Sequence, residues 1–91
     1  LLKRVVGVPG DTIEIKDNAV FINGKSVKIK GEEGRIEPGD LIYPLTLGEN
    51  EYFVMGDNVE VSLDSRSSSV GVIERDEIRT KFLCRFFSFK K

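Results

Sequence analysis

The sequence predicts a mainly β domain with long loops. Short stretches alternate polar and apolar residues with a period of two, which is the pattern of half-buried strands and is clearest over residues 12–16. Asn23-Gly24 is the strongest short hairpin signal in the chain. With 91 residues, of which 40% are hydrophobic and 32% charged, the chain has the size and composition of one folded domain or of part of one.

The first third of the chain is expected to form a strand, a turn and then a three-stranded meander. Pro9-Gly10-Asp11 should turn the chain, because proline fixes its own φ and glycine accepts a positive φ. Asp17-Asn18 and Asn23-Gly24 are both dipeptides typical of tight turns. The strands themselves are expected at residues 3–6, 12–16, 19–22 and 26–30.

The rest of the chain alternates loops with short regular elements. Residues 31–50 are broken repeatedly by glycine and proline, which predicts a long loop containing a short strand at residues 41–43. The remaining expected elements are a strand at residues 51–55, a loop at 56–71, one helical turn at 74–77 and a last strand at 79–89.

Composition excludes several kinds of site. The chain has no histidine, which excludes a Ser-His-Asp triad, a Cys-His pair and histidine-ligated metals. Cys84 is the only cysteine, so neither an intrachain disulfide nor a cysteine zinc site can form. Catalysis would therefore use a carboxylate, a tyrosine or a lysine as its proton carrier, and we expect no metal and no cofactor.

Charge and hydropathy argue against nucleic-acid binding and against a membrane-spanning helix or a signal peptide in these residues. The net charge of −1 argues against a nucleic-acid binder, which usually carries a strong basic excess. The longest unbroken apolar stretches, such as residues 52–55, are far shorter than the about 20 residues that a membrane-spanning helix needs. Leu1-Leu2 is too short to be the apolar segment of a signal peptide.

Two segments carry residues that could perform chemistry, residues 3–11 and residues 52–66. In the second, Asp57, Asp64 and Arg66 belong to one loop beside an apolar strand. Because residues two apart share a side in an extended chain, Asp64 and Arg66 can pair, and such a pair usually holds the shape of its loop. Taken alone, both segments also fit an ordinary strand followed by a turn or by an Asp-rich loop.

Lys3 opens an apolar strand that continues with Val5, Val6 and Val8. A lysine acts as a base only in its neutral form, and burial among apolar groups can lower its pKa enough for that. The strand pattern by itself favours an ordinary solvated lysine.

The longest motifs resemble those of one protein family. KRVVGVPGDTIEI is similar to the active-site lysine signature of bacterial type I signal peptidases, and YFVMGDNVEVSLDS resembles their second conserved box. FINGK and GVIERDEI are also similar to the family, so the likeness covers essentially the whole chain. The resemblance implies a serine endopeptidase that uses a Ser/Lys dyad to remove N-terminal signal peptides from exported proteins. It also implies an antiparallel β-sheet or open barrel-like domain of the signal peptidase type.

The resemblance assigns a role to each matching residue. Lys3 matches the general base, and Ser62 matches the serine that hydrogen-bonds that lysine and orients it. The residues that match the supporting ion pairs of the active-site loop are Arg4, Asp57, Asp64 and Arg66, with Arg4 as a partner for Asp57. The turn that holds the lysine strand is matched by Gly7, Pro9, Gly10 and Asp11.

The chain departs from the family pattern in two ways. Val59, Glu60 and Val61 stand where the family box usually has Arg-Asp-Asn. The family's nucleophilic serine lies in an earlier box that follows a membrane anchor, and nothing in residues 1–91 matches that box. We therefore expect residues 1–91 to be the C-terminal part of the extracytoplasmic catalytic β domain, inactive by itself. The alternatives are a catalytically inactive, signal-peptidase-like binding or assembly protein, and a self-cleaving repressor-type domain.

The expected partners also follow from the resemblance. They are the signal peptides of exported preproteins, bound as an extended strand at a sheet edge, and the membrane surface. The location implied is the bacterial cytoplasmic membrane, with the catalytic domain on its extracytoplasmic side. Basic and aromatic residues are interleaved over residues 79–91, a composition that suits a lipid headgroup surface, although a core strand ending in solvated lysines is the favoured interpretation.

Overall fold

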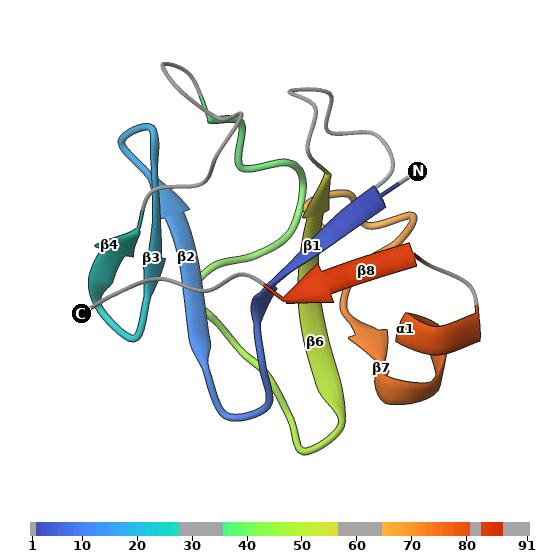
Figure 1. Ribbon diagram of the computed structural model, residues 1–91. Coiled ribbons are helices and arrows are strands. Elements are labelled where there is room, and N and C mark those ends of the chain that lie inside the picture. The colour runs from blue at the N-terminus through green and yellow to red at the C-terminus, as the bar shows by residue number, and fades with distance from the viewer. Residues whose placement is uncertain (1, 28–35, 57–64, 81–82, 87–91) are drawn as a thin grey trace.

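The computed structural model describes residues 2–27, 36–56, 65–80 and 83–86. Over these residues the chain forms two four-stranded sheets and one short helix, which confirms the expected mainly β fold (Figure 1). The elements are β1 (Leu2–Gly7), β2 (Thr12–Lys16), β3 (Ala19–Ile22), β4 (Lys25–Val27), β5 (Leu45–Thr46), β6 (Glu51–Gly56), β7 (Ile73–Glu74), α1 (Arg75–Thr80) and β8 (Leu83–Phe86). In the described part of the chain, no helix is long and apolar enough to cross a membrane.

The first sheet has the strand order β7-β6-β1-β8. β6 pairs antiparallel with β1 on one edge and with β7 on the other, whereas β8 runs parallel to β1. All residues of β6 from Tyr52 to Gly56 are buried, because this strand has a neighbour on both edges and packed side chains on both faces. β6 is therefore the centre of the molecule.

A shift in register within β1 divides its side chains between two clusters. Val5 pairs with Val54, but Gly7 pairs with Phe53, so the register moves by one residue at Val6. Val5 packs in a small cluster with Tyr52, Val54 and Ile73, on the side of the sheet where Ile78 of α1 also packs. Val6 joins the main core on the opposite side. The shift thus lets two consecutive valines serve two different cores.

The second sheet has the order β4-β3-β2-β5, and all of its pairs are antiparallel. The turns of the meander have positive φ at both central residues, 53° and 60° at Asp17 and Asn18 and 54° and 85° at Asn23 and Gly24. These are the angles that type I′ hairpin turns need. The expected meander is confirmed over residues 12–27, and residues 28–30 of its last strand lie outside the described residues.

Two segments pass from one sheet to the other and bond to each other. Residues 8–11 join β1 to β2, and residues 47–50 join β5 to β6. The Gly10 amide donates to the Leu47 carbonyl at 3.0 Å, and the Leu47 amide donates to the Asp11 carbonyl at 2.8 Å. Because both connections are tied together, the two sheets are held at a fixed separation.

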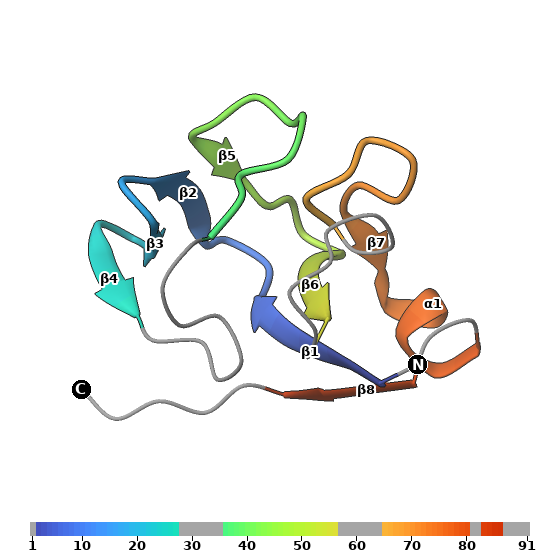
Figure 2. The same ribbon diagram turned by 90° about the horizontal axis from the view of Figure 1, so that it is seen from above.

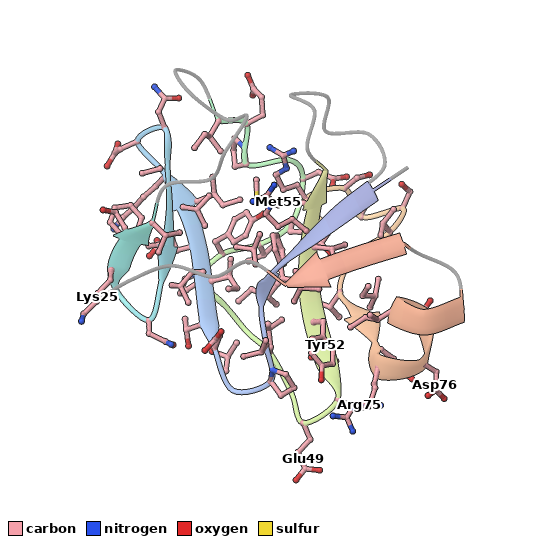
Figure 3. All side chains as sticks on the ribbon, in the orientation of Figure 1. Lys25, Glu49, Tyr52, Met55, Arg75 and Asp76 are labelled. Atoms are coloured by element: carbon pink, nitrogen blue, oxygen red, sulfur yellow. The ribbon has the colours of Figure 1, made fainter. Side chains whose placement is uncertain are left out.

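The main core fills the space between the sheets. Its buried side chains come from β1, β2, β3 and β6 and from two loop residues: Val6, Ile13, Ile15, Val20, Ile22, Ile36, Leu47, Phe53 and Met55. Seen from above, β1 and β6 lie between the second sheet and α1 (Figure 2). Met55 lies in the interior, whereas Lys25 and Glu49 point outward at the periphery (Figure 3).

Two expected strands are corrected. Residues 41–43 are not a strand, and the short strand lies instead at Leu45–Thr46, where Leu45 pairs with Ile13 of β2. Leu41 and Tyr43 pack against the main core and Ile42 is 87% exposed, so the side chains alternate as in a strand. Among the described residues, however, 41–44 pair with no neighbouring strand. Pro44 also has no amide hydrogen to donate to a ladder.

The last strand begins later than residue 79. The helical turn expected at 74–77 is confirmed but extends as α1 to Thr80, and β8 covers only Leu83–Phe86. The Glu77 carboxylate accepts the Glu74 amide hydrogen at 2.8 Å, which caps the helix start as in a capping box. Ile78 packs against the smaller cluster, and this contact favours a second helical turn over an early strand.

Gly7 gives a test of how closely the two sheets pack. A Cβ at this position would lie 2.6 Å from Ile13 Cδ1 and 2.9 Å from Leu47 Cδ1, both inside the core. We expect Gly7→Ala to lower the free energy of unfolding by about 1–3 kcal/mol through overpacking. The measurement is urea denaturation monitored by circular dichroism.

Gly48→Ala is the matched control for that experiment. Its Cβ would lie 3.2 Å from the end of the flexible Glu51 side chain, so we expect a change of no more than about 1 kcal/mol. Equal losses in the two variants would show that Gly7 is not in a tight contact between the sheets.

Candidate active site

The backbone register places Lys3 beside Gly56, within the second of the two segments that resemble signal peptidases, residues 52–66. Lys3 of β1 pairs with Gly56 of β6 on one edge and with Cys84 of β8 on the other. Gly56 directly precedes residues 57–64, so two segments more than 50 positions apart in the chain meet at this pair. Figure 1 shows the N-terminal end of β1 beside the C-terminal end of β6.

Arg4 follows Lys3 on the same strand and pairs with Met55 and Arg85. It is half-buried, on an interior strand of the sheet, next to the end of β6. Asp57, its expected partner, lies outside the described residues, so their ion pair stays a prediction. Ser62 and Asp64, the Val59-Glu60-Val61 departure and the side chain of Lys3 lie outside them as well.

The chain returns to β6 at Ser65, which is fully buried. The Ser65 amide donates to the Val54 carbonyl at 2.9 Å, and the Val54 amide donates to Ser65 Oγ at 2.9 Å. Gly56 is thus the last residue of the central strand, and Ser65 is hydrogen-bonded to Val54, two residues before that end. This fixes where the intervening segment leaves and rejoins the sheet.

Arg66 is buried, with 0% of its surface exposed. Its Nη1 donates to the Glu37 carbonyl at 3.4 Å, and its own carbonyl accepts the Asp40 amide hydrogen at 3.1 Å. A guanidinium needs partners of this kind, because an unpaired buried charge is very costly. The expected bracing role of Arg66 is compatible with this burial, whereas its ion pair with Asp64 stays a prediction.

The turn at residues 38–40 closes over this segment. Gly39 has a φ of +77°, and a Cβ there would overlap the Arg66 carbonyl group. The Asp40 carboxylate accepts the Ser68 amide at 2.7 Å and the Ser68 hydroxyl at 2.8 Å. These hydrogen bonds lower the pKa of Asp40 below its ordinary value of 3.8. We call Gly39, Asp40, Arg66 and Ser68 the loop clamp.

The turn after the lysine strand is well defined. The Val8 amide donates to Asp11 Oδ2 at 3.0 Å, and the Asp11 amide donates to the Val8 carbonyl at 3.0 Å. Gly10 has a φ of +91°, as a turn centred on Pro9-Gly10 requires. Asn23 Nδ2 donates to Asp11 Oδ1 at 2.9 Å, so this turn also contacts the β3–β4 hairpin turn of the second sheet.

Of the loop clamp, only Arg66 was predicted from the sequence, and no role was predicted for Ser65, Gly39, Asp40 or Ser68. Gly39, Asp40 and Ser68 lie in stretches without periodicity, and they meet only because the chain folds back over 26 to 29 positions. A signal for Gly39 and Asp40 was that the Pro-Gly-Asp triplet of residues 9–11 occurs again at residues 38–40. Both of its glycines have a positive φ, and both of its aspartates accept hydrogen bonds. Among the residues that the structure describes, no group of three or more acidic or cysteine side chains could hold a metal ion.

The clamp can be tested at Gly39. Gly39→Ala forces a left-handed alanine and also pushes its Cβ against the Arg66 carbonyl carbon, 2.6 Å away. Gly24→Ala is the control, because Gly24 has a similar φ of +85° but no atom within 4 Å of its Cβ. We expect Gly24→Ala to cost about 1–2 kcal/mol and Gly39→Ala to cost a further ~1–3 kcal/mol in urea denaturation. Identical costs would show that Gly39 does not touch Arg66.

The pH dependence of stability tests the Asp40–Ser68 hydrogen bonds. Because the pKa of Asp40 is lower in the folded protein than in the unfolded chain, its stabilisation is complete above the ordinary value of 3.8. It is lost as the pH falls through the folded pKa. We expect the difference in unfolding free energy between wild type and Ser68→Ala to be constant above pH 3.8 and to shrink below it. Ser26→Ala, at an exposed position in β4, should show no such dependence.

Comparison with known proteins agrees with the motifs. A family model described as "Signal peptidase, peptidase S26" matches residues 1–87. Signal peptidase I of Bacillus licheniformis is 34% identical over 98 residues, which cover 99% of this chain and 52% of that protein. Signal peptidase I T of Bacillus subtilis (strain 168) is 39% identical over 101 residues, covering 99% of this chain and 50% of that protein.

A staphylococcal relative gives the same result. Signal peptidase IB of Staphylococcus aureus (strain N315) is 33% identical over 110 residues, covering 99% of this chain and 54% of that protein. The chain thus spans about half the length of the curated relatives that it matches. Because the family model matches residues 1–87 of 91, the chain belongs to the signal peptidase family, peptidase S26.

Proposed function

We propose that this chain is the lysine-bearing part of a type I signal peptidase, a serine endopeptidase that removes signal peptides from exported proteins. The observation that carries the proposal is the pairing of Lys3 with Gly56, because it brings the lysine strand to the beginning of the segment that contains Asp57, Ser62 and Asp64. Membership of the signal peptidase family supports it.

The proposed chemistry begins with neutral Lys3. It accepts the proton of a serine hydroxyl that belongs to a segment outside these 91 residues, and the serine oxygen attacks the carbonyl carbon before the cleavage site. The resulting ammonium then donates its proton to the leaving amine as the peptide bond breaks. Water hydrolyses the acyl-enzyme in a second round, with Lys3 again as base, and this restores the serine.

The other predicted site residues position this base. Ser62 would hydrogen-bond Lys3 and orient it, while pairs formed by Arg4 with Asp57 and by Arg66 with Asp64 would brace the loop. Burial of Arg66 supports a structural role for that residue, because a charge that is fully removed from water is retained only where its partners are fixed.

We further propose that the substrate binds as an extended strand at a sheet edge, on the extracytoplasmic side of the bacterial cytoplasmic membrane. β1 already has a neighbour on each edge over residues 3–5, so this stretch of the lysine strand is not the edge that receives it. Main-chain hydrogen bonds would supply affinity, and pockets for alternate side chains would supply specificity.

The two proposed dyad roles predict unequal losses. In the full-length enzyme, Lys3→Ala should abolish cleavage of a signal-peptide substrate, whereas Ser62→Ala should lower kcat only by about 2- to 13-fold, the equivalent of one hydrogen bond of about 0.5–1.5 kcal/mol. The matched controls are Lys25→Ala and Ser26→Ala, both at exposed positions in β4. Equal losses for Lys3→Ala and Ser62→Ala would contradict these roles.

The 91-residue chain by itself should not cleave a signal-peptide substrate, because no serine in it matches the nucleophile of the family. Cleavage products are measured by mass spectrometry after incubation with the peptide. Specific cleavage by the isolated chain that Lys3→Ala abolishes would show that the nucleophile lies within residues 1–91.

A further inference from the structure

Ser65 makes an unusual pair of contacts with the central strand. It is fully buried, and it both donates to and accepts from the backbone of one residue, Val54, at 2.9 Å in each case. In a sheet, the amide and the carbonyl of a residue normally both bond to backbone groups of the neighbouring strand. Here the Ser65 hydroxyl takes the place of the backbone carbonyl that would accept the Val54 amide hydrogen. The contact therefore depends on the identity of residue 65.

The geometry of β6 explains why this contact matters. In a strand, the amide and the carbonyl of a residue point to the same edge. Both groups of Val54 bond to Ser65, so they face away from β1, and the Val5–Val54 pair is of the non-hydrogen-bonded type. Without the Ser65 hydroxyl, the buried Val54 amide hydrogen would lose the acceptor that faces it.

Val54 lies two residues before Gly56, the residue opposite Lys3. On the edge of β6 that faces away from β1, β7 pairs only with Glu51 and Tyr52. Nearer the Lys3 end of β6, the hydrogen bonds on this edge come from Ser65. The same contact sets the point at which the chain rejoins the sheet after Gly56. One hydroxyl therefore stabilises both the pairing register of β1 and β6 beside Lys3 and the point at which the chain rejoins β6 at Ser65.

We propose that Ser65 is a positioning residue of the peptidase reaction, which acts through β6 to hold the Lys3–Gly56 pair in place. This inference rests on the proposed function, because it takes Lys3 as the base. Ser65 is not a catalytic residue, since it acts on Val54 and not on substrate. Its loss should therefore lower kcat more than it changes KM.

The test compares two isosteric variants of the full-length enzyme, Ser65→Thr and Ser65→Val. Both variants give the side chain the same branched shape in the same buried site, but valine has a methyl group where threonine keeps the hydroxyl. We expect Ser65→Val to have a kcat about 100-fold below that of Ser65→Thr, because small displacements of a catalytic group cost about that much. KM should agree within about threefold between the two variants.

Two controls separate positioning from general loss of stability. Ser26→Ala removes an exposed hydroxyl in β4 and should leave kcat unchanged. Ile22→Val removes one methyl group from the main core and should lower stability without lowering kcat at a temperature where the protein is folded. If Ile22→Val lowers kcat as much as Ser65→Val does, the effect is not specific to position 65 and the inference fails.

The remaining outcomes also decide the question. Equal kcat values for Ser65→Thr and Ser65→Val, or a change in KM alone, would overturn the inference. If Ser65→Val does not fold, Ser65→Ala replaces it, and a chain that folds only with a hydroxyl at position 65 would make Ser65 a folding residue and overturn the proposal. A wild-type enzyme that does not cleave signal peptides would instead contradict the proposed function.

Discussion

The antiparallel pairing of β1 with β6 is the interaction on which the rest of the structure depends. It builds the middle of the first sheet, and the register shift at Val6 sends neighbouring valines into the two hydrophobic clusters. It also sets Lys3 opposite Gly56. Because β6 is packed on both faces, it cannot shift without disturbing the core. The position of β1, the lysine strand that pairs with it, is therefore determined by the packing of the core rather than by the loops around it.

The connections between the sheets make this arrangement rigid. The segments before β2 and before β6 bond to each other through Gly10, Asp11 and Leu47, and Gly7 lets them approach closely. On the edge of β6 that faces away from β1, Ser65 bonds to Val54, and the loop clamp holds residues 66–68. The backbone pair of Lys3 and Gly56 thus lies between two sets of contacts, which suits a reaction that needs a base in one orientation.

Local patterns predicted the elements that local forces determine. The alternation in β2 and the turn dipeptides Asp17-Asn18 and Asn23-Gly24 led to the meander, because side-chain period and positive φ are properties of adjacent residues. The two-residue β5, placed at Leu45–Thr46 instead of residues 41–43, depends on its partner strand β2. The predicted start of the last strand, at residue 79, was wrong for a similar reason. Contacts of Ile78 with residues distant in the sequence favour a helix there.

The site shows the same division. Residues 3–11 and 52–66 were visible as motifs, and the roles predicted for them came from resemblance to a family, but no spacing in the sequence showed that Lys3 and Gly56 are paired. The burial of Arg66 and the contacts of Ser65, Gly39 and Asp40 arise from long-range packing, which periodicity cannot report. The roles of Ser62, Asp57 and Asp64 stay predictions.

The most direct test of the central claim is a nuclear Overhauser measurement on the isotope-labelled full-length enzyme. Because Val5 and Val54 form a non-hydrogen-bonded pair, the alternation of an antiparallel ladder makes Lys3 and Gly56 a pair of the same type, with closely spaced α carbons. The account predicts a strong cross-strand contact between the Hα atoms of Lys3 and Gly56. A contact from Lys3 to a different residue of β6, or none at all, would contradict it.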